Sequence, residues 1–517
     1  MKNFIIDQLI ENKNKEIVSF HTPGHKNGRI YEELGYRDVL NKLYKIDTTE
    51  IIGTDNLHLP EGIIKKAQDR AAKVFNAKHT YFLINGSTCG VQASILSVCD
   101  KYGSKIIVNR DCHQSVVNTC ILGDIEPVYI NCQICEKSSV LKGVNFKDVK
   151  VVIDENLDAK ALVLTYPTYY GMTYDLKKIC DYAHNNGIIV IVDEAHGAHL
   201  ELSEDLPMSS LCLGADLVIQ SCHKTLPSFT QSSLLHIGSN IIDVDRLSSF
   251  LRILESSSPS YLLLASLEIS IDIYEKHGNK LMKELLNNID NFKIDFEVES
   301  LDDIDNLLNG KSNLVHDKNR QSNGLSRDVC VHRCKKDTKG FKIYQTSDKT
   351  KIFISSKELG IDGYKLEEML RYDHNIQVEL SNHSGVLLLC SIANNINDFK
   401  KLKDALIDIR KDALVSEFLD DKREVNDIEF PKTLPEKIVS PSQAFYKHTK
   451  SVKIDESVGK VCAECITPYP PGVNIISPGE IIESSIIEYI LYCKDNGMNI
   501  SGTKDKDLNF IEVIDDI

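Results

Sequence analysis

The sequence predicts a doubly wound α/β domain built around a mostly parallel sheet of seven strands. Short apolar runs recur between Thr80 and Gly238, and most are continuous rather than alternating, as expected for strands covered on both faces. Helix-like patterns separate several of these runs, which favours helices on both sides of the sheet. The predicted strands are Tyr81–Ile84, Lys105–Val108, Pro127–Ile130, Ala161–Leu164, Ile188–Val192, Asp216–Ile219 and Leu234–Ile237.

Helical patterns cover Gly90–Lys101 and Leu176–Asn186, and Gly187 suits the C-terminal cap of the second helix. Helical sequence then continues over Val244–Asn288. A weaker α/β pattern follows, and its polar middle, Leu301–Asp337, predicts a loop-rich stretch.

A chain of 517 residues is too long for one ordinary domain. We expect an N-terminal segment (1–45), a major α/β domain (46–290), a small α/β domain (291–413) and a C-terminal α+β domain (414–517). The last follows a charged stretch, Arg410–Lys437, and contains the proline-rich Pro468–Gly472.

Composition excludes several classes of partner. The chain has 60 Lys+Arg against 75 Asp+Glu, a net charge of −15 that repels nucleic acid and anionic lipid. Met1–Phe20 lacks the apolar core of a signal peptide, and no run approaches the roughly 18 apolar residues of a membrane span. Fifteen cysteines without a secretion signal indicate thiols in a reducing compartment, so we expect a cytoplasmic protein.

Two Cys-x-x-Cys pairs, Cys132/Cys135 and Cys462/Cys465, have the spacing of half a zinc site each. They lie far apart in sequence, and neither has a second pair or a histidine nearby. We therefore interpret them as scattered buried thiols and predict no metal site.

The Asp193-Glu194-Ala195-His196 box follows the predicted strand Ile188–Val192. A helicase would need an upstream phosphate loop, and the only Gly-Lys-Ser, at Gly310, follows the box and lacks the first glycine of that loop. An acid at the end of a central strand instead suits a ligand contact. A buried Asp193 needs a cationic partner, such as a protonated pyridine nitrogen; otherwise it only caps the next turn.

Lys224 follows another predicted strand, in Ser221-Cys222-His223-Lys224. A lysine at a strand end is commonly a solvated surface residue. Here Pro227–Gln231 leads directly into the next apolar strand, so we expect Lys224 to point into a cleft. A desolvated lysine loses its proton more readily and becomes a nucleophile towards an aldehyde.

The turn Asn85–Gly90 connects a predicted strand to a helix. Backbone N–H groups at a helix start favour a phosphate, and Ser87 and Thr88 add hydroxyl donors; a plain helix cap is compatible with the same pattern. His113, also at a strand end, can stack on a flat cofactor, although a hydrogen-bonded core histidine is the default for one His alone.

These elements, in this order, resemble the Orn/Lys/Arg decarboxylase family of fold-type I pyridoxal-phosphate (PLP) enzymes. The resemblance covers most of the chain. The motifs that carry it are His21-Thr22-Pro23-Gly24-His25-Lys26, Asp47–Glu50, Asp55–Leu57, Asn85–Cys89, His113, Tyr166–Gly171, Asp193–His196, His223-Lys224, Glu464 and Pro468–Gly472.

The resemblance implies an aspartate aminotransferase-like large domain and a carboxy-lyase. It implies that Lys224 binds PLP covalently, that Asp193 pairs with the pyridinium nitrogen and that His113 stacks on the ring. His196 is expected beside the O3′ side of the cofactor. The phosphate contacts are expected from Ser87, Thr88, Ser221 and His223, and Cys89 is also expected to bind the cofactor.

Two departures qualify these expectations. Cys222 stands where many relatives have threonine before the His-Lys pair, so its role is open. The extra N-terminal wing domain of the long, acid-responsive relatives is not expected here, because the His-Thr-Pro-Gly-His box begins at His21. The short form resembles biosynthetic enzymes that act as homodimers or dimers of dimers, with Asp47–Asp55 as a segment lent to the neighbouring subunit.

Rival functions are an aminotransferase and a non-catalytic PLP-binding protein. Aminotransferases commonly hold the carboxylate with an arginine near the end of a small-domain strand, and the run Val386–Leu389 is followed by Cys390-Ser391-Ile392 instead. The resemblance favours arginine decarboxylation to agmatine for polyamine synthesis, with lysine or ornithine as alternative substrates. Glu464 is the candidate for binding the distal cation of the substrate.

Overall fold

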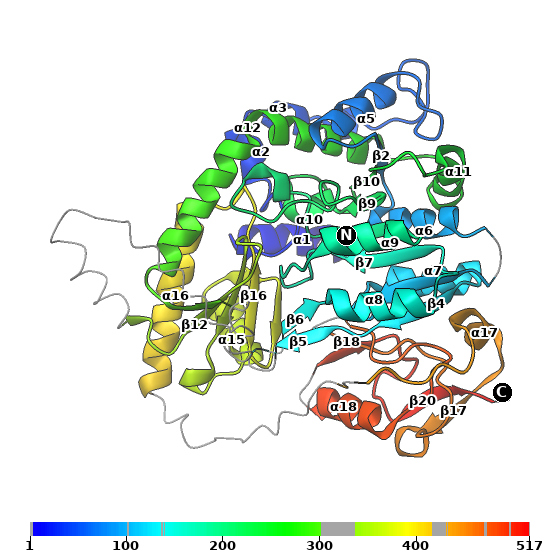
Figure 1. Ribbon diagram of the computed structural model, residues 1–517. Helices are drawn as coiled ribbons and strands as arrows, with labels where there is room; N and C mark the ends of the chain where they lie inside the picture. The colour runs from blue at the N-terminus through cyan, green and yellow to red at the C-terminus, as the bar shows by residue number, and fades with distance from the viewer. Residues whose placement is uncertain are drawn as a thin grey trace.

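The computed structural model describes residues 4–100, 103–135, 138, 140–300, 337–415, 431, 433–469, 473–495 and 498–515. The predicted loop-rich stretch lies outside these residues except for Asp337. Residues 470–472 of the proline-rich motif and much of the charged stretch 410–437 also lie outside them. Figure 1 shows a large α/β body, a smaller sheet beside it and the C-terminal region below the large sheet.

The large sheet has seven strands in the order β2-β10-β9-β8-β7-β3-β4. Strand β10 is antiparallel to both of its neighbours, and the remaining pairs are parallel. All seven predicted strands are confirmed, and so is the mostly parallel sheet. The strands are β2 (His79–Leu83), β3 (Lys105–Asn109), β4 (Glu126–Ile130), β7 (Ala161–Thr165), β8 (Ile189–Asp193), β9 (Leu217–Gln220) and β10 (Ser233–Ile237).

Helices connect the parallel strands. Helix α6 (Gly86–Val98) begins earlier than the predicted Gly90, because Gly86 adopts a φ of 74° and lets the chain turn into the helix directly after β2. Helix α9 (Leu176–Asn185) ends with Asn186 as its C-cap, and the predicted Gly187 follows directly with a φ of 73°. The other helices between these strands are α7 (Gln114–Gly123) and α8 (Phe146–Glu155), and a small hairpin pairs β5 (Gln133–Cys135) with β6 (Val140–Gly143).

The continuous helical pattern predicted over Val244–Asn288 is wrong in one respect. The structure has two helices, α11 (Val244–Leu254) and α12 (Tyr261–Lys293). The intervening Ser-Ser-Ser-Pro sequence interrupts them, because proline disfavours a helical conformation in the residue before it. The Ser260 side chain then accepts a hydrogen bond from the Leu263 N–H and starts α12.

The N-terminal part of the chain, up to residue 74, shares one hydrophobic core with both α/β sheets. Strand β1 (Val18–Phe20) pairs in parallel with β14 (Ile376–Val378) near the small sheet. The Asp55 carboxylate accepts N–H groups at the start of α5, including those of Gly62 and Ile64. The helices of residues 4–74 are α1 (Phe4–Asn14), α2 (Arg29–Glu33), α3 (Arg37–Leu40), α4 (Leu43–Ile46) and α5 (Ile63–Val74).

The small sheet has the order β11-β12-β13-β16-β15 and lies beside helices α12 and α16. Its strands are β11 (Glu297–Ser300), β12 (Lys342–Gln345), β13 (Lys351–Ser355), β15 (Leu380–Asn382) and β16 (Gly385–Leu389), and its helices include α15 (Gly363–Glu368) and α16 (Ile396–Val415).

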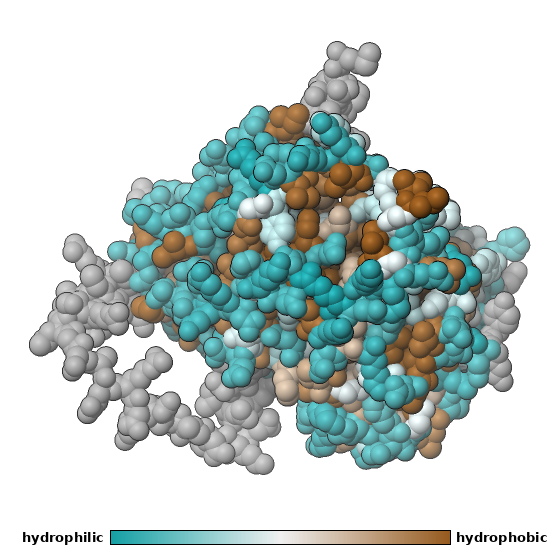
Figure 2. Space-filling model, turned by 90° about the horizontal axis from the view of Figure 1, so that it is seen from above, coloured by the Kyte–Doolittle hydropathy of each residue, from teal (hydrophilic) through white to brown (hydrophobic). Residues whose placement is uncertain are grey.

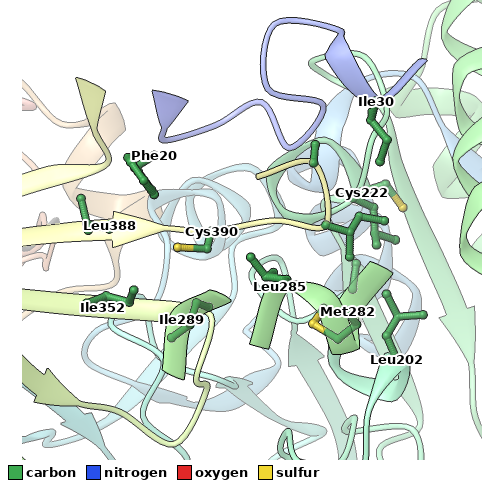
Figure 3. Packing of buried hydrophobic residues seen from close by; sticks show 14 of the residues in the cluster. Phe20, Ile30, Leu202, Cys222, Met282, Leu285, Ile289, Ile352, Leu388 and Cys390 are labelled. Atoms are coloured by element: carbon green, nitrogen blue, oxygen red, sulfur yellow. The ribbon is translucent and has the colours of Figure 1, made fainter. Parts of the chain in front are cut away.

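One hydrophobic core joins the small sheet to α12. Figure 3 shows Ile352 of β13 and Leu388 of β16 near Ile289 of α12, with Cys222 of the large domain in the same cluster. Because side chains alternate along a strand, Lys351 lies on the opposite face of β13 from Ile352. This alternation directs a buried lysine away from the core.

The C-terminal region contains α17 (Pro441–Tyr446), β17 (Thr449–Lys453), β18 (Thr467–Tyr469), α18 (Ser484–Asp495), β19 (Asn499–Ser501) and β20 (Phe510–Ile514). Its two strand pairs, β17 with β20 and β18 with β19, are antiparallel and join segments that are distant in sequence. The Lys437 ammonium contacts the Glu126 carboxylate at 2.8 Å and so joins this region to β4. Among the described helices, none combines the length and the apolar character that crossing a membrane requires.

Candidate active site

A cavity opens at the edge of the large sheet where the parallel strands end. Strands β3, β7 and β8 each contribute residues at or just beyond their carboxyl ends, as open α/β sheets do at ligand sites. The C-terminal region adds Val473. The lining residues are Ser87, Asp111, His113, Leu141, Thr165, Tyr169, Asp193, Ala195, His196, Lys224 and Val473.

Lys224 lies in the short helix α10 (Cys222–Thr225), directly after β9. Its Nζ atom lies 3.1 Å from Nε2 of His196. Burial lowers the pKa of Lys224, and the nearby Asp193 carboxylate opposes this shift. The position and the lowered pKa suit a nucleophilic amine.

The N-terminal box holds the backbone of this helix. The Gly24 N–H donates to the carbonyl of His223 at 2.7 Å. A Cβ at position 24 would lie 2.5 Å from the Leu226 carbonyl oxygen, so only glycine permits this approach. The first box of the resemblance therefore supports the helix that carries Lys224.

Asp193 and Glu194 have different surroundings although they are adjacent. Asp193 ends β8, lines the cavity and accepts the Ala195 N–H at 3.1 Å. Glu194 points into the protein, where Ser209, Ser210 and Gln220 donate to its carboxylate. Burial raises the pKa of Glu194 to about 7. Only Asp193 is available to a ligand in the cavity.

His113 caps α7: its Nδ1 accepts the Ser115 N–H at 3.2 Å. This bond requires an unprotonated Nδ1 and orients the ring. The side chain is exposed where it lines the cavity. An exposed ring in a cavity offers a flat face to a planar ligand.

The four predicted phosphate contacts and Cys89 have different surroundings. Ser87 lines the cavity at the start of α6, and the Ser221 hydroxyl donates to it at 2.9 Å. Thr88 is exposed at the same helix start. The Cys89 thiol is buried and donates to the Gly86 carbonyl, and His223 bonds through Nδ1 to the Ser232 carbonyl at 3.0 Å. Of these five residues, only Ser87 is among the described residues that line the cavity.

Cys222, whose role the sequence leaves open, is fully buried and belongs to the hydrophobic core (Figure 3). Cys132 instead donates to the Asp111 carboxylate at 2.6 Å, while Cys462 contacts the Glu464 backbone in the C-terminal region. The first cysteines of the two Cys-x-x-Cys pairs thus have separate local partners.

Glu464 is buried in the C-terminal region. Its carboxylate accepts the backbone N–H groups of Lys504 at 2.6 Å and Glu512 at 3.2 Å. It is not among the described residues that line the cavity of this chain. Its predicted contact with a substrate cation stays a prediction.

The sequence did not indicate Lys351 as a site residue. Its ammonium nitrogen lies 3.0 Å from Nδ1 of His196 and donates to the Tyr169 carbonyl at 3.2 Å. The Tyr169 ring packs edge-on against His196, with centroids 4.6 Å apart. The Tyr169 hydroxyl donates to Glu379, whose other oxygen accepts the Thr22 N–H. These contacts bring the small domain and the N-terminal box to the site.

The chemistry of the donors fits pyridoxal phosphate. The cavity combines an amine for an aldehyde, a carboxylate for a pyridinium nitrogen and a helix start with hydroxyls for a phosphate. Together with the mostly parallel large sheet and the small α/β domain, these groups define the class as fold-type I PLP enzymes.

The chain belongs to the Orn/Lys/Arg decarboxylase family. Residues 5–398 match the major domain of that family and residues 425–506 match its C-terminal domain. The chain is 33% identical over 506 residues to arginine decarboxylase of Bacillus subtilis, covering 98% of this chain and 96% of that protein. It is also 33% identical over 500 residues to arginine decarboxylase of Halalkalibacterium halodurans, covering 96% and 94%.

Among solved structures, the constitutive lysine decarboxylase of Escherichia coli has a similar fold. The TM-score is 0.72 at 19% identity, and the match covers 99% of this chain and 81% of that chain. At this identity the likeness concerns the fold alone. It agrees with the family assignment and with the predicted fold class.

Proposed function

We propose that this protein is a PLP-dependent arginine decarboxylase that converts L-arginine to agmatine and CO₂. The observation that carries the choice of arginine is the 33% identity to the arginine decarboxylase of Bacillus subtilis over nearly the whole of both chains. Lysine and ornithine are the alternative substrates. The curated lysine decarboxylase of Pseudomonas aeruginosa is only 23% identical, over 94% of this chain.

Four cavity residues would hold the cofactor. Lys224 would bind its aldehyde carbon, Asp193 its ring nitrogen and Ser87 its phosphate, while His113 would stack on its ring. When bound, PLP supplies an electron sink for the pair left by the departing CO₂. Asp193 would keep the ring nitrogen protonated through its negative charge.

The carboxylate that leaves as CO₂ must be replaced by a proton at Cα. Lys224 is the lysine among the described residues that line the cavity, and we assign it the proton transfer from Nζ to Cα. His196, 3.1 Å from Nζ, is placed to exchange a proton with it. This role uses the same amine first to hold the cofactor and then to complete the reaction.

The end of β16 supports decarboxylation over transamination. Cys390 is buried there, and the Ser391 hydroxyl donates to the Gly24 carbonyl at 2.5 Å. This segment contains no arginine to hold a carboxylate. A site that releases the carboxylate has no need of that tight contact.

A three-substrate assay tests the function. Purified protein saturated with PLP is incubated with arginine, lysine or ornithine, and CO₂ and keto acid are measured. Arginine should give CO₂ and agmatine with the highest kcat/KM. A higher kcat/KM for lysine or ornithine contradicts arginine as the substrate. Formation of keto acid indicates an aminotransferase, and no turnover at all contradicts the enzyme assignment.

A cytoplasmic location stays a prediction from the sequence.

We also propose that the protein acts as a homodimer or a dimer of dimers, with Asp47–Asp55 reaching the neighbouring subunit. Tyr44, Ile51, Ile52 and Leu59 are more than half exposed in and around this segment. Exposed apolar side chains that gather in one region commonly mark an interface. Figure 2 shows hydrophobic residues in brown among the hydrophilic ones on the face seen from above.

Subunit mixing tests this arrangement. A Lys224→Ala subunit is mixed with a subunit in which Glu50 and Asp47 are changed to alanine. If the segment completes the neighbour's site, the mixture should recover up to about a quarter of the wild-type activity, since one site in a hybrid carries neither change. Two inactive parents with an inactive mixture, after subunit exchange is confirmed by mass, would contradict it.

A further inference from the structure

A neutral imidazole lies between two lysine side chains. Nδ1 of His196 is 3.0 Å from the Lys351 amine, and Nε2 is 3.1 Å from the Lys224 amine. Burial lowers the pKa of His196 well below its ordinary value, and the charges of both lysines act in the same direction. The ring is therefore neutral, with one N–H donor and one bare nitrogen.

This arrangement cannot be satisfied by two ammonium groups. An ammonium group only donates hydrogen bonds, and the neutral ring has one acceptor nitrogen. If both contacts are hydrogen bonds, one lysine must be a neutral amine that accepts the ring N–H. The question is which of the two carries the charge.

The surroundings favour the charge on Lys351. Its amine also donates to the Tyr169 carbonyl at 3.2 Å and lies 5.6 Å from the centre of the Tyr169 ring. A carbonyl oxygen and a ring face both favour a cation. Burial lowers the pKa of Lys351 only to about 8, and Asp348 opposes that shift, so the proton remains at neutral pH.

Lys224 has fewer groups that would hold a proton. Within the part of the chain that the structure describes, His196 is the hydrogen-bond partner recorded for its amine. The titratable groups that interact electrostatically with Lys224 or with its neighbour His196 are Asp193, Glu379, His113, His196, His223 and Lys351. Those that act on Lys351 are Asp348, Glu379, Lys224, Lys26 and Cys390.

We propose that Lys351 is a positioning residue that acts through His196. Its ammonium donates to Nδ1, the ring proton therefore stays on Nε2, and this N–H is directed at the Lys224 amine, which is kept neutral and ready to react with an aldehyde. The inference rests on the proposed function for the role of Lys224. The order of hydrogen bonds follows from the contacts of the protein alone.

The test measures the basicity of the Lys224 amine in the full chain purified without PLP. The protein is treated with trace acetic anhydride over a range of pH, and acetylation of Lys224 is followed by mass spectrometry. Lys351→Met removes the donor and the charge at similar size. In this variant, we expect the pH midpoint of Lys224 acetylation to rise by about one unit. Below the midpoint, acetylation of Lys224 should therefore be roughly tenfold slower than in the wild type.

Matched variants separate this role from a general effect of losing a buried lysine. Lys351→Arg keeps a permanent cation with N–H donors, so the midpoint should return to near the wild-type value. Lys293→Met removes another buried lysine, whose amine has no hydrogen-bond partner among the described residues, and should leave the midpoint unchanged. Thermal unfolding confirms that each variant is folded.

A double variant tests whether the effect passes through His196. In a His196→Gln background, Lys351→Met should shift the midpoint by much less than in the wild type. An equal shift there would mean direct charge repulsion and would overturn the proposal, as would no shift in the single variant. Because no decarboxylation is measured, these results stand apart from the three-substrate assay.

The wild-type protein provides a measurement that needs no variant at position 351. The ¹⁵N NMR signals of His196 are assigned as those that disappear in His196→Gln. They should show a protonated Nε2 and an unprotonated Nδ1. The opposite tautomer would overturn the proposal.

Discussion

Arg110 and Glu480 form a buried, two-pronged salt bridge between the large domain and the C-terminal region. The two N–O contacts are 2.7 and 2.8 Å, and the guanidinium also donates to the Ile475 carbonyl at 3.0 Å. The Arg110 guanidinium lies over the Tyr129 ring. Because His113 follows three residues later, this pair connects the C-terminal region to the loop that forms one wall of the cavity.

Glu480→Gln should destabilise the protein by about 3–5 kcal/mol, because it leaves a buried guanidinium without its counter-charge. Urea unfolding measures the change. The matched control is Lys437→Met, which removes the more exposed salt bridge to Glu126 between the same two parts and should cost less than about 1 kcal/mol. Equal effects of the two changes would contradict a special role for the buried pair.

Asp193→Asn should retain PLP yet lose at least about a hundredfold in kcat. The amide oxygen can still accept the Ala195 N–H, so the local fold is kept, but a neutral side chain cannot hold the ring nitrogen in its protonated form. CO₂ release and the cofactor absorbance are measured together. Full turnover in this variant would show that Asp193 does not have the assigned role.

His236 should make the protein less stable in acid. Its ring is fully buried, Nδ1 contacts the Thr80 hydroxyl and Nε2 contacts the Gln220 side-chain oxygen. Burial lowers its pKa from 6.5 to about 3. The unfolded chain binds a proton below pH 6.5 and the folded chain does not, so stability is present above pH 6.5 and is lost as the pH falls towards 3.

At pH 5 this group alone should cost about 2 kcal/mol relative to pH 8. Chemical unfolding of wild type and His236→Gln at the two pH values measures the difference. The variant should be less stable at pH 8, and its loss between pH 8 and 5 should be smaller by about that amount. Parallel pH curves would exclude His236 as the source.

Gly24→Ala should weaken both stability and PLP retention. The added Cβ would lie 2.5 Å from the carbonyl oxygen of Leu226, directly after the helix that carries Lys224, and backbone cannot easily move aside. We expect a cost of about 1–3 kcal/mol, measured by thermal and urea unfolding. In Gly278→Ala, the new Cβ meets the end of the flexible Leu202 side chain, and alanine favours the helix, so the cost should be smaller.

Much of the large domain could be predicted from the sequence. Its strands are buried on both faces and appear as continuous apolar runs, so each was located to within about two residues. The same pattern places Asp193 at the end of β8 and Lys224 shortly after β9. Helix limits were less accurate where local chemistry decided them, as at Gly86 and at the break before Ser260.

The site was predicted as far as its residues lie at the ends of those strands. Ser87, His113, Asp193, His196 and Lys224 all line one cavity, because parallel strands bring their carboxyl ends to one edge. Three residues of the predicted motifs instead bond to backbone groups of the protein: Cys89, His223 and Glu464. These contacts depend on the direction of each side chain, which sequence order does not determine.

The sequence by itself determined the strands, the amine, the acid and the helix start, because each depends on a few neighbouring residues and on strand order. Only the tertiary structure decided that Lys351 and Glu379 of the small domain reach the same site. A lysine at the start of a strand has the pattern of a solvated residue. Its burial beside His196 arises from the packing of two domains, and contacts between segments distant in sequence leave no local pattern.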